Sequence, residues 1–314
     1  MSVMPEVVAI VGPTASGKTA LSVRLAEETG GEIINGDALQ VYRGLDIGTA
    51  KITEEEKRGV PHHLFDILEP SDSFSVFDYQ ERVRGKIREI NSRGRLPILV
   101  GGTGLYVQAV LFDFRFTDQK SDPAFRSEME QLLEQNGPEA LHAELARLDP
   151  DAALSIHPNN TRRVLRALEI VGVTGRPRAE LEDSGNRRPV FRHLLTGLDM
   201  DREKLYERIN LRFDLMMEAG FAEEVRRLAE AGLTGAQSMK AIGYREIASA
   251  LSGEIPMEEA LELAKRNTRR YAKRQLTYFR NKLDVHWLDA EEGTEKNLSQ
   301  ILNLLKEFGA GSRI

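Results

Sequence analysis

The sequence predicts an α/β fold with a parallel β-sheet and an additional all-helical insert. In the first third of the chain, short apolar runs alternate with helix-forming segments, an order typical of a parallel sheet with helices on both faces. From about residue 122 to about residue 175, the sequence predicts helices and no strand. Strand-like sequence then returns, so the simplest arrangement is a helical insert within one α/β core.

The first α/β segment contains three predicted strands. The β-branched run Val7–Val11 predicts the first strand, and a helix over Lys18–Glu28 follows it and is stopped by Gly30-Gly31. The remaining elements of this segment are a short strand over Glu32–Asn35, a helix over Phe77–Asn91 and a buried strand over Leu96–Val100 that runs into "GGTGLY".

The predicted insert begins at Asp122-Pro123, an N-cap followed by proline at the first helical position. Its helices are expected at 123–135, 138–148 and 159–171, with the polar loop 176–189 after them. We then expect a strand over Phe191–Leu198, mainly helices after Asp201, a strand over Val285–Leu288 and a closing helix near Glu295–Phe308. These elements predict a core formed by 1–117 and 189–314, and an insert over 118–188.

The composition excludes several classes of protein. The 314 residues include no cysteine, which excludes disulfides, thiolate catalysis and cysteine-ligated zinc. No apolar run approaches the roughly 20 residues that span a bilayer, and the N-terminus has no secretory signal, so we expect a cytoplasmic protein without membrane contact. We also expect a monomer. The net charge of −6 means that any binding to nucleic acid needs a local basic patch.

A phosphate-binding loop is the strongest single motif. Residues 12–19, "GPTASGKT", fit the pattern G-x-x-x-x-G-K-[ST] between a predicted strand and a predicted helix. Glycines allow backbone N–H groups to converge on an anion, and the helix N-terminus adds its positive end. Lys18 would neutralise phosphate oxygens, and the hydroxyl of Thr19 would bind Mg²⁺. We predict phosphate binding by Gly12, Pro13, Thr14, Ala15, Ser16, Gly17, Lys18 and Thr19.

The usual second acid of a nucleotide hydrolase is missing. Such enzymes hold magnesium with a carboxylate at the end of a second strand, but Leu96–Val100 ends in "GGTG". The acid at a strand end is Asp37, which follows "EIING". The residues alone leave its role open, because Gly36-Asp37 is equally good turn chemistry.

A basic segment near the C-terminus predicts a cationic helix face. Residues 265–282 contain eight basic residues and no acidic one. On a helix, one stripe holds Arg266, Arg270, Lys273, Thr277 and Arg280, and the opposite side holds Ala264, Tyr271, Tyr278 and Phe279. The alternatives are phosphate contacts and an ordinary solvated face. In an acidic chain, the unbroken run of cations favours phosphate contacts.

Six segments in order resemble the bacterial tRNA dimethylallyltransferases, also called tRNA isopentenyltransferases. They are "GPTASGKTAL", "GDALQVYRGLDIGTAK", "PHHLFD", "VGGTGLY", "AIGYRE" and "AKRQLTYFR", and they span nearly the whole chain. The resemblance implies a core like that of P-loop nucleotide kinases and a helical insert that holds the anticodon stem-loop. It implies transfer of a dimethylallyl group from dimethylallyl diphosphate to the exocyclic amine of the adenosine 3′ to the anticodon, with Mg²⁺ and release of pyrophosphate.

The resemblance also implies roles for particular residues. Asp37 matches the general base, Gln40 could read the base edge, and Thr103 matches a contact to the substrate nucleotide. Further tRNA contacts are implied at Ala38, Leu39, Arg126, Thr161, Arg162, Arg163, Val164 and Leu165. From the sequence alone, Arg162, Arg163 and Arg166 are ordinary surface arginines.

Two pairs of residues have competing interpretations. Arg208 and Arg212, four apart on a predicted helix, could reach the diphosphate or form salt bridges with Glu203 or Glu207. His62-His63 could suggest a metal site, but neighbouring strand residues point to opposite faces, so we expect packed histidines.

The sequence departs from the family pattern at three positions. Ala38 and Asn35 stand where serine is usual, and Ile52 replaces a proline. The loss of a hydroxyl at position 38 removes one possible hydrogen bond to the target base.

Three other functions remain to be weighed. They are a P-loop small-molecule kinase, a prenyltransferase that acts on free adenine nucleotides, and an RNA-binding protein without enzymatic activity. A kinase needs a second magnesium acid and has no use for the cationic helix. For free nucleotides the insert would be superfluous, and a plain RNA binder leaves Asp37 and the phosphate loop without a role.

Overall fold

The computed structural model describes residues 4–113, 122–177 and 188–311. Six parallel strands form one sheet in the order β3-β2-β4-β1-β5-β6. The strands are β1 (Val7–Val11), β2 (Glu32–Asn35), β3 (His62–His63), β4 (Pro97–Gly101), β5 (His193–Asp199) and β6 (His286–Asp289). This confirms the predicted α/β fold with a parallel sheet, in which β3 is a strand of only two residues.

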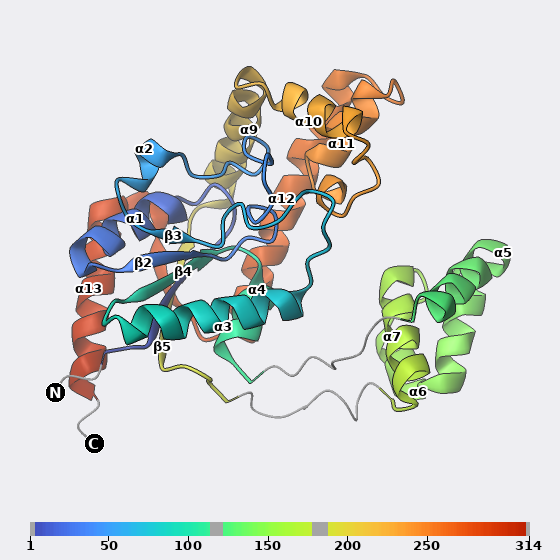
Figure 1. Cartoon of the computed structure of the whole chain (residues 1–314), viewed down its shortest axis with the longest axis horizontal. Helices are drawn as coiled ribbons and strands as arrows, with labels where there is room; N and C mark the ends of the chain where they lie inside the picture. The colour runs from blue at the N-terminus through green and yellow to red at the C-terminus, as the bar shows by residue number, and fades with distance from the viewer. Residues whose placement is uncertain (1–3, 114–121, 178–187, 312–314) are drawn as a thin grey trace. The chain divides into compact units, whose positions relative to one another are not determined.

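The helices of this part are α1 (Lys18–Thr29), α2 (Glu54–Lys57), α3 (Val76–Ser92), α4 (Gly104–Leu111), α9 (Arg202–Glu218), α10 (Phe221–Glu230), α11 (Tyr244–Leu251), α12 (Met257–Lys282) and α13 (Thr294–Gly311). Short 3₁₀ turns occur at Ser238–Lys240 and Ala290–Glu292. Figure 1 shows α1, α3 and α13 beside the sheet, and α10 and α11 grouped together farther from it.

Alternating side chains of β1 contribute to two hydrophobic cores. Val8 and Ile10 belong to a cluster with apolar residues of α1 and α13. Val7, Ala9 and Val11 belong to a second cluster with residues of α3, α4 and the helices after Asp201. Because successive strand residues point to opposite faces, β1 is buried on both sides, as its continuous apolar sequence requires.

The chain divides into two compact units, which are residues 1–112 with 189–314, and residues 113–188. The second unit contains α5 (Pro123–Leu148), α6 (Pro150–Ser155) and α7 (Thr161–Thr174). Met129, Leu141, Leu145, Val164 and Leu168 are among the residues of its own core. The expected start of the insert at 118, and most of the polar loop expected at 176–189, lie outside the described residues.

One expected loop in the helical unit is a helix. The segment "DPDA" lies between the helices expected at 138–148 and 159–171, but Asp149 is the N-cap of α6, and its carboxylate accepts a hydrogen bond from the N–H of Ala152 at 3.0 Å. Pro150 occupies the first helical position, so this is the same cap-and-proline signal as Asp122-Pro123. The two helices expected at 123–135 and 138–148 form α5, which is interrupted at Gly137 with φ +82°.

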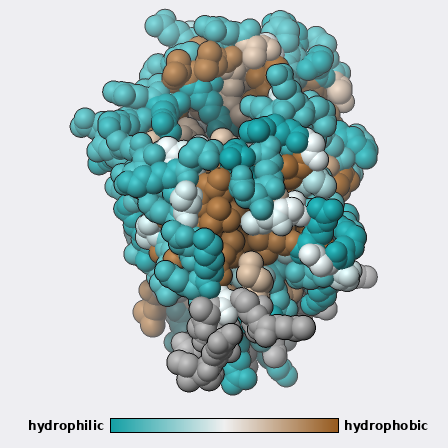
Figure 2. Space-filling model, turned by 90° about the vertical axis from the view of Figure 1, so that its left-hand side faces the viewer, coloured by the Kyte–Doolittle hydropathy of each residue, from teal (hydrophilic) through white to brown (hydrophobic). Residues whose placement is uncertain are grey.

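No helix in the described part of the chain is long and apolar enough to cross a membrane. The face shown in Figure 2 is mostly hydrophilic, with hydrophobic side chains visible between the polar ones.

The carboxyl ends of β2 and β4 approach each other more closely than side chains allow. A Cβ atom on Gly101 would lie 2.2 Å from the carbonyl oxygen of Gly36, and one on Gly36 would lie 2.7 Å from that of Val100. Because β2 and β4 are parallel, the two following loops, which carry Asp37 and Thr103, leave the sheet at the same edge, and glycine at both positions allows them to lie close together.

We predict that Gly101→Ala destabilises the α/β unit by about 1–3 kcal/mol, because backbone must move to relieve the clash. The control is Gly85→Ala, at an exposed position inside α3 with nothing within 4 Å of an added Cβ. Alanine there should raise stability by up to about 1 kcal/mol. Urea unfolding followed by circular dichroism measures both. Equal stability of Gly101→Ala and the parent would contradict the close-approach argument.

Candidate active site

The phosphate loop connects β1 to α1 at the carboxyl edge of the sheet. Gly12, Ala15 and Gly17 have φ angles of +145°, +65° and +93°, which curl the loop tightly. A Cβ on Gly12 would lie 2.6 Å from the carbonyl oxygen of Leu198, so only glycine fits there. No side chain caps the N-terminus of α1. Its first N–H groups are therefore available to an anion.

Lys18 lies beside this loop, and its pKa is well below that of an ordinary lysine. Its Nζ donates a hydrogen bond to the carbonyl oxygen of Pro13 at 2.6 Å. Burial and then the charge of Arg212 lower the pKa of Lys18 from 10.5 to about 7, while the Asp37 carboxylate opposes this shift. Burial likewise lowers the pKa of Arg212, and Asp37 again opposes it. Two cations and one carboxylate therefore share one partly desolvated site, which suits a polyanionic ligand.

Asp37 is held in a defined turn. Asn35 and Asp37 exchange two hydrogen bonds: the N–H of Asp37 donates to Asn35 Oδ1 at 2.8 Å, and Asn35 Nδ2 donates to the carbonyl oxygen of Asp37 at 3.1 Å. Asp37 Oδ1 accepts a hydrogen bond from the N–H of Leu39 at 2.8 Å. Asp37 thus has the turn geometry that the sequence allowed, and its carboxylate lies close enough to Lys18 and Arg212 to act on the pKa of each. The asparagine at position 35 holds this turn.

Gln275 joins two loops of the site to the basic helix. This buried side chain of α12 accepts a hydrogen bond from the N–H of Thr14 at 3.2 Å and donates one to the carbonyl oxygen of Gly102 at 2.9 Å. A Cβ on Gly102 would lie 2.2 Å from Gln275 Nε2, and one on Gly104 would lie 2.3 Å from the ring of Tyr278. The buried face of α12 therefore sets the distance between the phosphate loop and the loop that carries Thr103.

Thr103 and Asp37 share a neighbour in Tyr271 of α12. Burial and the Asp37 carboxylate raise the pKa of Tyr271, whereas hydrogen bonding with Thr103 and Gln275 lowers it. Thr103 precedes α4 and makes no side-chain cap to it. Its hydroxyl therefore does not cap the helix and is within hydrogen-bonding distance of Tyr271.

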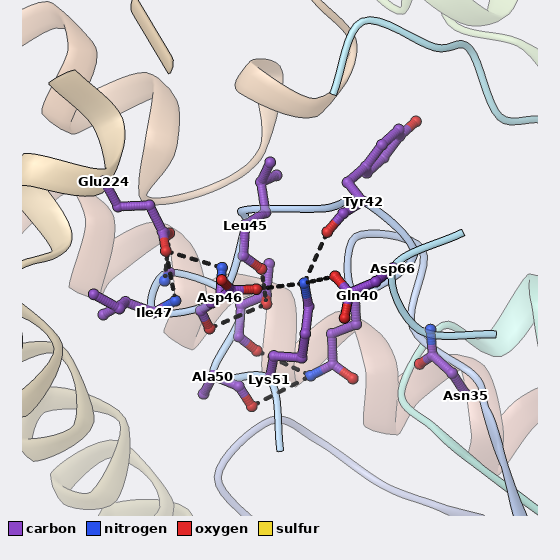
Figure 3. A network of polar contacts seen from close by, with 12 residues as sticks. Asn35, Gln40, Tyr42, Leu45, Asp46, Ile47, Ala50, Lys51, Asp66 and Glu224 are labelled. Carbon is purple, nitrogen blue, oxygen red and sulfur yellow. Dashed lines mark hydrogen bonds and ion pairs between the residues drawn. The ribbon is translucent and has the colours of Figure 1, made fainter. Parts of the chain in front are cut away.

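The loop after β2 contains a polar network, shown in Figure 3. Gln40 Nε2 donates hydrogen bonds to the carbonyl oxygens of Thr49 at 3.0 Å and Ala50 at 3.4 Å. Lys51 Nζ donates to the carbonyl oxygen of Tyr42 at 2.8 Å and pairs with Asp46 and Asp66, each at 2.6 Å. The amide nitrogen of Gln40 is therefore engaged within the chain, so any contact to a base would use its oxygen.

Arg208 and Arg212 are placed differently. Arg212 is partly buried, lies close enough to Lys18 to contribute to its lowered pKa, and donates to the carbonyl oxygen of Thr49 at 3.3 Å. Arg208 is exposed one turn earlier on α9 and makes no salt bridge among the described residues, including with Glu203 or Glu207. Only Arg212 is brought into the site.

The predicted cationic stripe lies on the outer face of α12. Arg266, Arg270 and Lys273 are exposed. Arg280 is also exposed, but it pairs with Asp199 and its guanidinium lies 5.8 Å from the ring centre of Trp287. Trp287 packs against the hydrophobic core. Of the predicted stripe, the three residues nearer the start of the segment have no carboxylate partner in the described chain.

In the helical unit, the predicted contact residues divide into two groups. Arg162 and Arg163 are exposed in the first turn of α7, with Thr161 partly exposed at its start. Val164 and Leu165 are 0% and 8% exposed and belong to the core of this unit. Their side chains therefore pack inside this unit, and the implied tRNA contact at these two positions stays a prediction. The helical period placed them on the inner face.

Arg126 of α5 is paired within the helical unit. It lies 2.6 Å from buried Glu169 and 2.8 Å from Glu130, and Arg166 also pairs with Glu169 at 3.1 Å. These contacts give Arg126 a structural role between α5 and α7, and leave part of its side chain exposed.

The two histidines of β3 have separate partners. His62 Nδ1 lies 2.8 Å from the carbonyl oxygen of Val60, and His63 Nε2 lies 2.7 Å from Glu32. Glu32 also pairs with Arg93 at 2.7 Å. This group lies at the amino end of β2, at the edge of the sheet opposite Asp37.

The metal-binding capacity of the site is small. Among the described residues, no group of three or more His, Asp or Glu side chains could hold a metal ion. Thr19, at the exposed start of α1, supplies one hydroxyl beside the phosphate loop. This donor set fits Mg²⁺, which keeps several waters and is bound chiefly by the phosphates of a ligand.

Three side chains around the site were not singled out by the sequence analysis: Gln275, Glu224 and Tyr244. Gln275 has a recognisable signal, because it is a polar residue that falls beside Ala272 and Phe279 on the buried side of α12. Glu224 is likewise a charged residue on the buried side of the amphipathic helix α10. A buried polar residue on an apolar face needs a partner, which makes it a candidate for a structural or functional contact.

The family model described as IPP transferase matches residues 40–282 of this chain. A protein of Bacillus velezensis, named tRNA dimethylallyltransferase, is 58% identical over 283 residues, which are 90% of each chain. A protein of Bacillus subtilis with the same name is 53% identical over 294 residues, which are 94% of each chain.

Two solved structures are similar over nearly the whole chain. The full-length tRNA isopentenylpyrophosphate transferase of Bacillus halodurans superposes with a TM-score of 0.74 at 48% identity, and the match covers 98% of this chain and 99% of that one. A eukaryotic dimethylallyltransferase, described as acting on tRNA, superposes with a TM-score of 0.83 at 31% identity, over 98% of this chain and 80% of that one.

We predict that binding of a diphosphate ester takes up a proton between pH 7.5 and 9. In this range the unliganded Lys18, with a pKa of about 7, is largely neutral, and the bound anion raises that pKa. Affinity should therefore fall as the pH rises above 7. Calorimetry in two buffers of different ionisation enthalpy measures the proton uptake. Lys18→Arg is the control, since arginine stays charged throughout. Equal proton uptake in both proteins would rule out Lys18 as its source.

Proposed function

Because the chain belongs to the IPP transferase family, it is an enzyme that transfers a dimethylallyl group to tRNA, and on that premise we propose how its residues divide the reaction. The donor is dimethylallyl diphosphate. The acceptor is the exocyclic amine of the adenosine 3′ to the anticodon, and pyrophosphate leaves. The observation that carries this proposal is the meeting of Asp37, Lys18 and Arg212 at the end of the phosphate loop.

In this proposal the phosphate loop holds the leaving group. The N–H groups at the start of α1, with Lys18 and Arg212, bind the diphosphate and stabilise the charge that grows on it as the allylic carbon–oxygen bond breaks. The low-dielectric surroundings that lower the pKa of Lys18 also strengthen its attraction to a bound anion.

Asp37 is assigned as the general base. The amine nitrogen forms a bond to the allylic carbon, the diphosphate oxygen takes the electron pair of the broken bond, and the amine proton passes to Asp37. One carboxylate oxygen accepts from the N–H of Leu39 at 2.8 Å, which fixes the orientation of the group. Thr103, which shares the neighbour Tyr271 with Asp37, would bind the same amine or its base.

A magnesium ion is assigned to the diphosphate. Thr19 would be its protein ligand, and the ion would supply further charge stabilisation to the leaving group. The donor set at the loop supports this assignment, because a single hydroxyl suits an ion that travels with its substrate.

Two surfaces are assigned to tRNA. The first is the exposed stripe of Arg266, Arg270 and Lys273 on α12. The second, in the helical unit, is the start of α7 with Arg162 and Arg163, where uncapped N–H groups and two cations suit a phosphate. The target adenosine must leave its stack to reach Asp37, which costs less in an anticodon loop than in a duplex.

The alternative functions lack support. The family match and the names of the relatives disfavour a small-molecule kinase, which would also require a magnesium acid that β4 does not provide.

One assay tests the reaction and its acceptor. The protein is incubated with labelled dimethylallyl diphosphate, Mg²⁺ and either unmodified tRNA or AMP. Label in tRNA alone supports the proposal, and label in AMP alone overturns it.

We predict that Asp37→Asn lowers kcat by about 100-fold or more while tRNA affinity stays near that of the parent, since a general base typically contributes 10²–10⁴-fold. Single-turnover assays and filter binding measure the two quantities. Asp284→Asn, which removes an exposed carboxylate after α12, is the matched control and should leave both unchanged. Turnover of Asp37→Asn near that of the parent would remove Asp37 from this role.

We predict that Arg270→Glu with Lys273→Glu weakens tRNA binding and reduces the slope of log affinity against log salt by about 1.5, as expected for two lost phosphate contacts. Arg82→Glu with Lys86→Glu on α3 makes the same change of charge on another helix and should have a smaller effect. If the salt slope of the α12 variant stays unchanged, the stripe is a solvated face.

A further inference from the structure

Glu224 is a buried carboxylate that belongs to none of the groups assigned above. It is 1% exposed, on α10. Its Oε2 accepts from the N–H groups of Asp46 at 2.9 Å and Ile47 at 2.8 Å, and its Oε1 accepts from the N–H of Gly48 at 3.0 Å. Tyr244 OH also donates to Oε1 at 2.6 Å. Four hydrogen bonds therefore compensate the buried charge, and no salt bridge does so in the part of the chain that is described.

The same loop is packed tightly against α10 and α11. A Cβ on Gly48 would lie 2.1 Å from the ring of Phe221 and 2.6 Å from the ring of Tyr244. Burial and the Glu224 carboxylate raise the pKa of Tyr244, so its hydroxyl remains a donor at any working pH. The loop is thus held by hydrogen bonds on its N–H groups and by ring contacts on its Cα side.

The residue after this anchored turn contacts two side chains of the candidate site. The carbonyl oxygen of Thr49 accepts from Gln40 Nε2 at 3.0 Å and from Arg212 at 3.3 Å. Figure 3 shows Glu224 on one side of the loop and Gln40 on the other. A shift of the turn at 46–48 would therefore move the acceptor that holds a base-contact residue and a diphosphate-contact residue together.

We propose that Glu224 is a positioning residue, which fixes the turn at 46–48 and through the carbonyl of Thr49 sets the places of Gln40 and Arg212 for tRNA and diphosphate. Tyr244 assists by orienting the carboxylate. This inference rests on the proposed function, because its kinetic consequences are defined for dimethylallyl transfer to tRNA.

The chemistry requires a carboxylate at position 224. Both of its oxygens only accept, and each one receives two donors. In Glu224→Gln, the NH₂ group of the amide must face one of these pairs of donors. At least one backbone N–H then loses its acceptor in a buried place, so the turn must shift.

The test compares Glu224→Gln with Glu32→Gln in the full-length protein. Glu32 is also a buried glutamate with hydrogen-bonded partners, but it lies at the opposite edge of the sheet from Asp37. Both variants should lose thermal stability. For Glu224→Gln we expect kcat/KM to fall about 10- to 100-fold, with higher KM values for both tRNA and dimethylallyl diphosphate, as displacements near 1 Å cause. Glu32→Gln should keep the kinetic constants of the parent at temperatures where it is folded.

A double-mutant cycle with Gln40→Ala tests whether Glu224 acts through Gln40. In that background, Glu224→Gln should raise the KM for tRNA by much less than it does in the parent. Tyr244→Phe, which keeps the carboxylate and the ring, is the milder variant and should show the same pattern at a few-fold scale. If Glu224→Gln does not fold, Tyr244→Phe takes its place in the kinetic comparison.

Two outcomes would overturn the inference. One is parent-like KM values in folded Glu224→Gln or Tyr244→Phe, and the other is full additivity with Gln40→Ala. Calorimetric binding of dimethylallyl diphosphate without tRNA reports on Arg212 independently of turnover and should weaken in Glu224→Gln. A parent protein that binds the diphosphate but does not prenylate tRNA would instead contradict the proposed function, which separates the two failures.

Discussion

The close approach of glycine backbones at the carboxyl edge of the sheet is the constraint on which the site depends. Gly36 and Gly101 allow the ends of β2 and β4 to come within a distance that any Cβ would block, and Gly12 does the same for the phosphate loop against Leu198. Because the strands are parallel, all three following loops leave the sheet on one side. The diphosphate grip, the candidate base and Thr103 can therefore share one small volume.

Two helices, α12 and α10, hold these loops at fixed distances from one another through hydrogen bonds. Gln275 of α12 holds the phosphate loop and the Thr103 loop with one amide, and Glu224 of α10 holds the loop that carries Gln40 with one carboxylate. The outer face of α12 meanwhile presents cations to solvent. The buried face of α12 thus contributes to the site, and its exposed face contributes to the proposed nucleic-acid surface. Substitutions on the buried face are therefore expected to affect the site, and substitutions on the exposed face to affect tRNA binding.

The electrostatic balance follows from this geometry. Burial and then the charge of Arg212 lower the pKa of Lys18, and the Asp37 carboxylate partly offsets both effects. A bound diphosphate would neutralise the remaining positive charge, since its negative charge relieves the repulsion between the two cations. The motif predicted Lys18 as a phosphate ligand. The near-neutral pKa could not be predicted, because it depends on burial and on an arginine about two hundred residues away.

The fold class, most strands and helices, the phosphate loop and the place of Asp37 at a strand end are predictable from the sequence, because periodicity, glycine placement and motif spacing are local properties. The helix α6 is an exception, because its cap-and-proline start also resembles a loop. Which side chains meet depends on the tertiary structure. It buried Val164 and Leu165, engaged the amide of Gln40, separated Arg208 from Arg212 and brought Gln275 and Glu224 to loops far away in the chain. Those outcomes arise from contacts between distant segments, which no local pattern encodes.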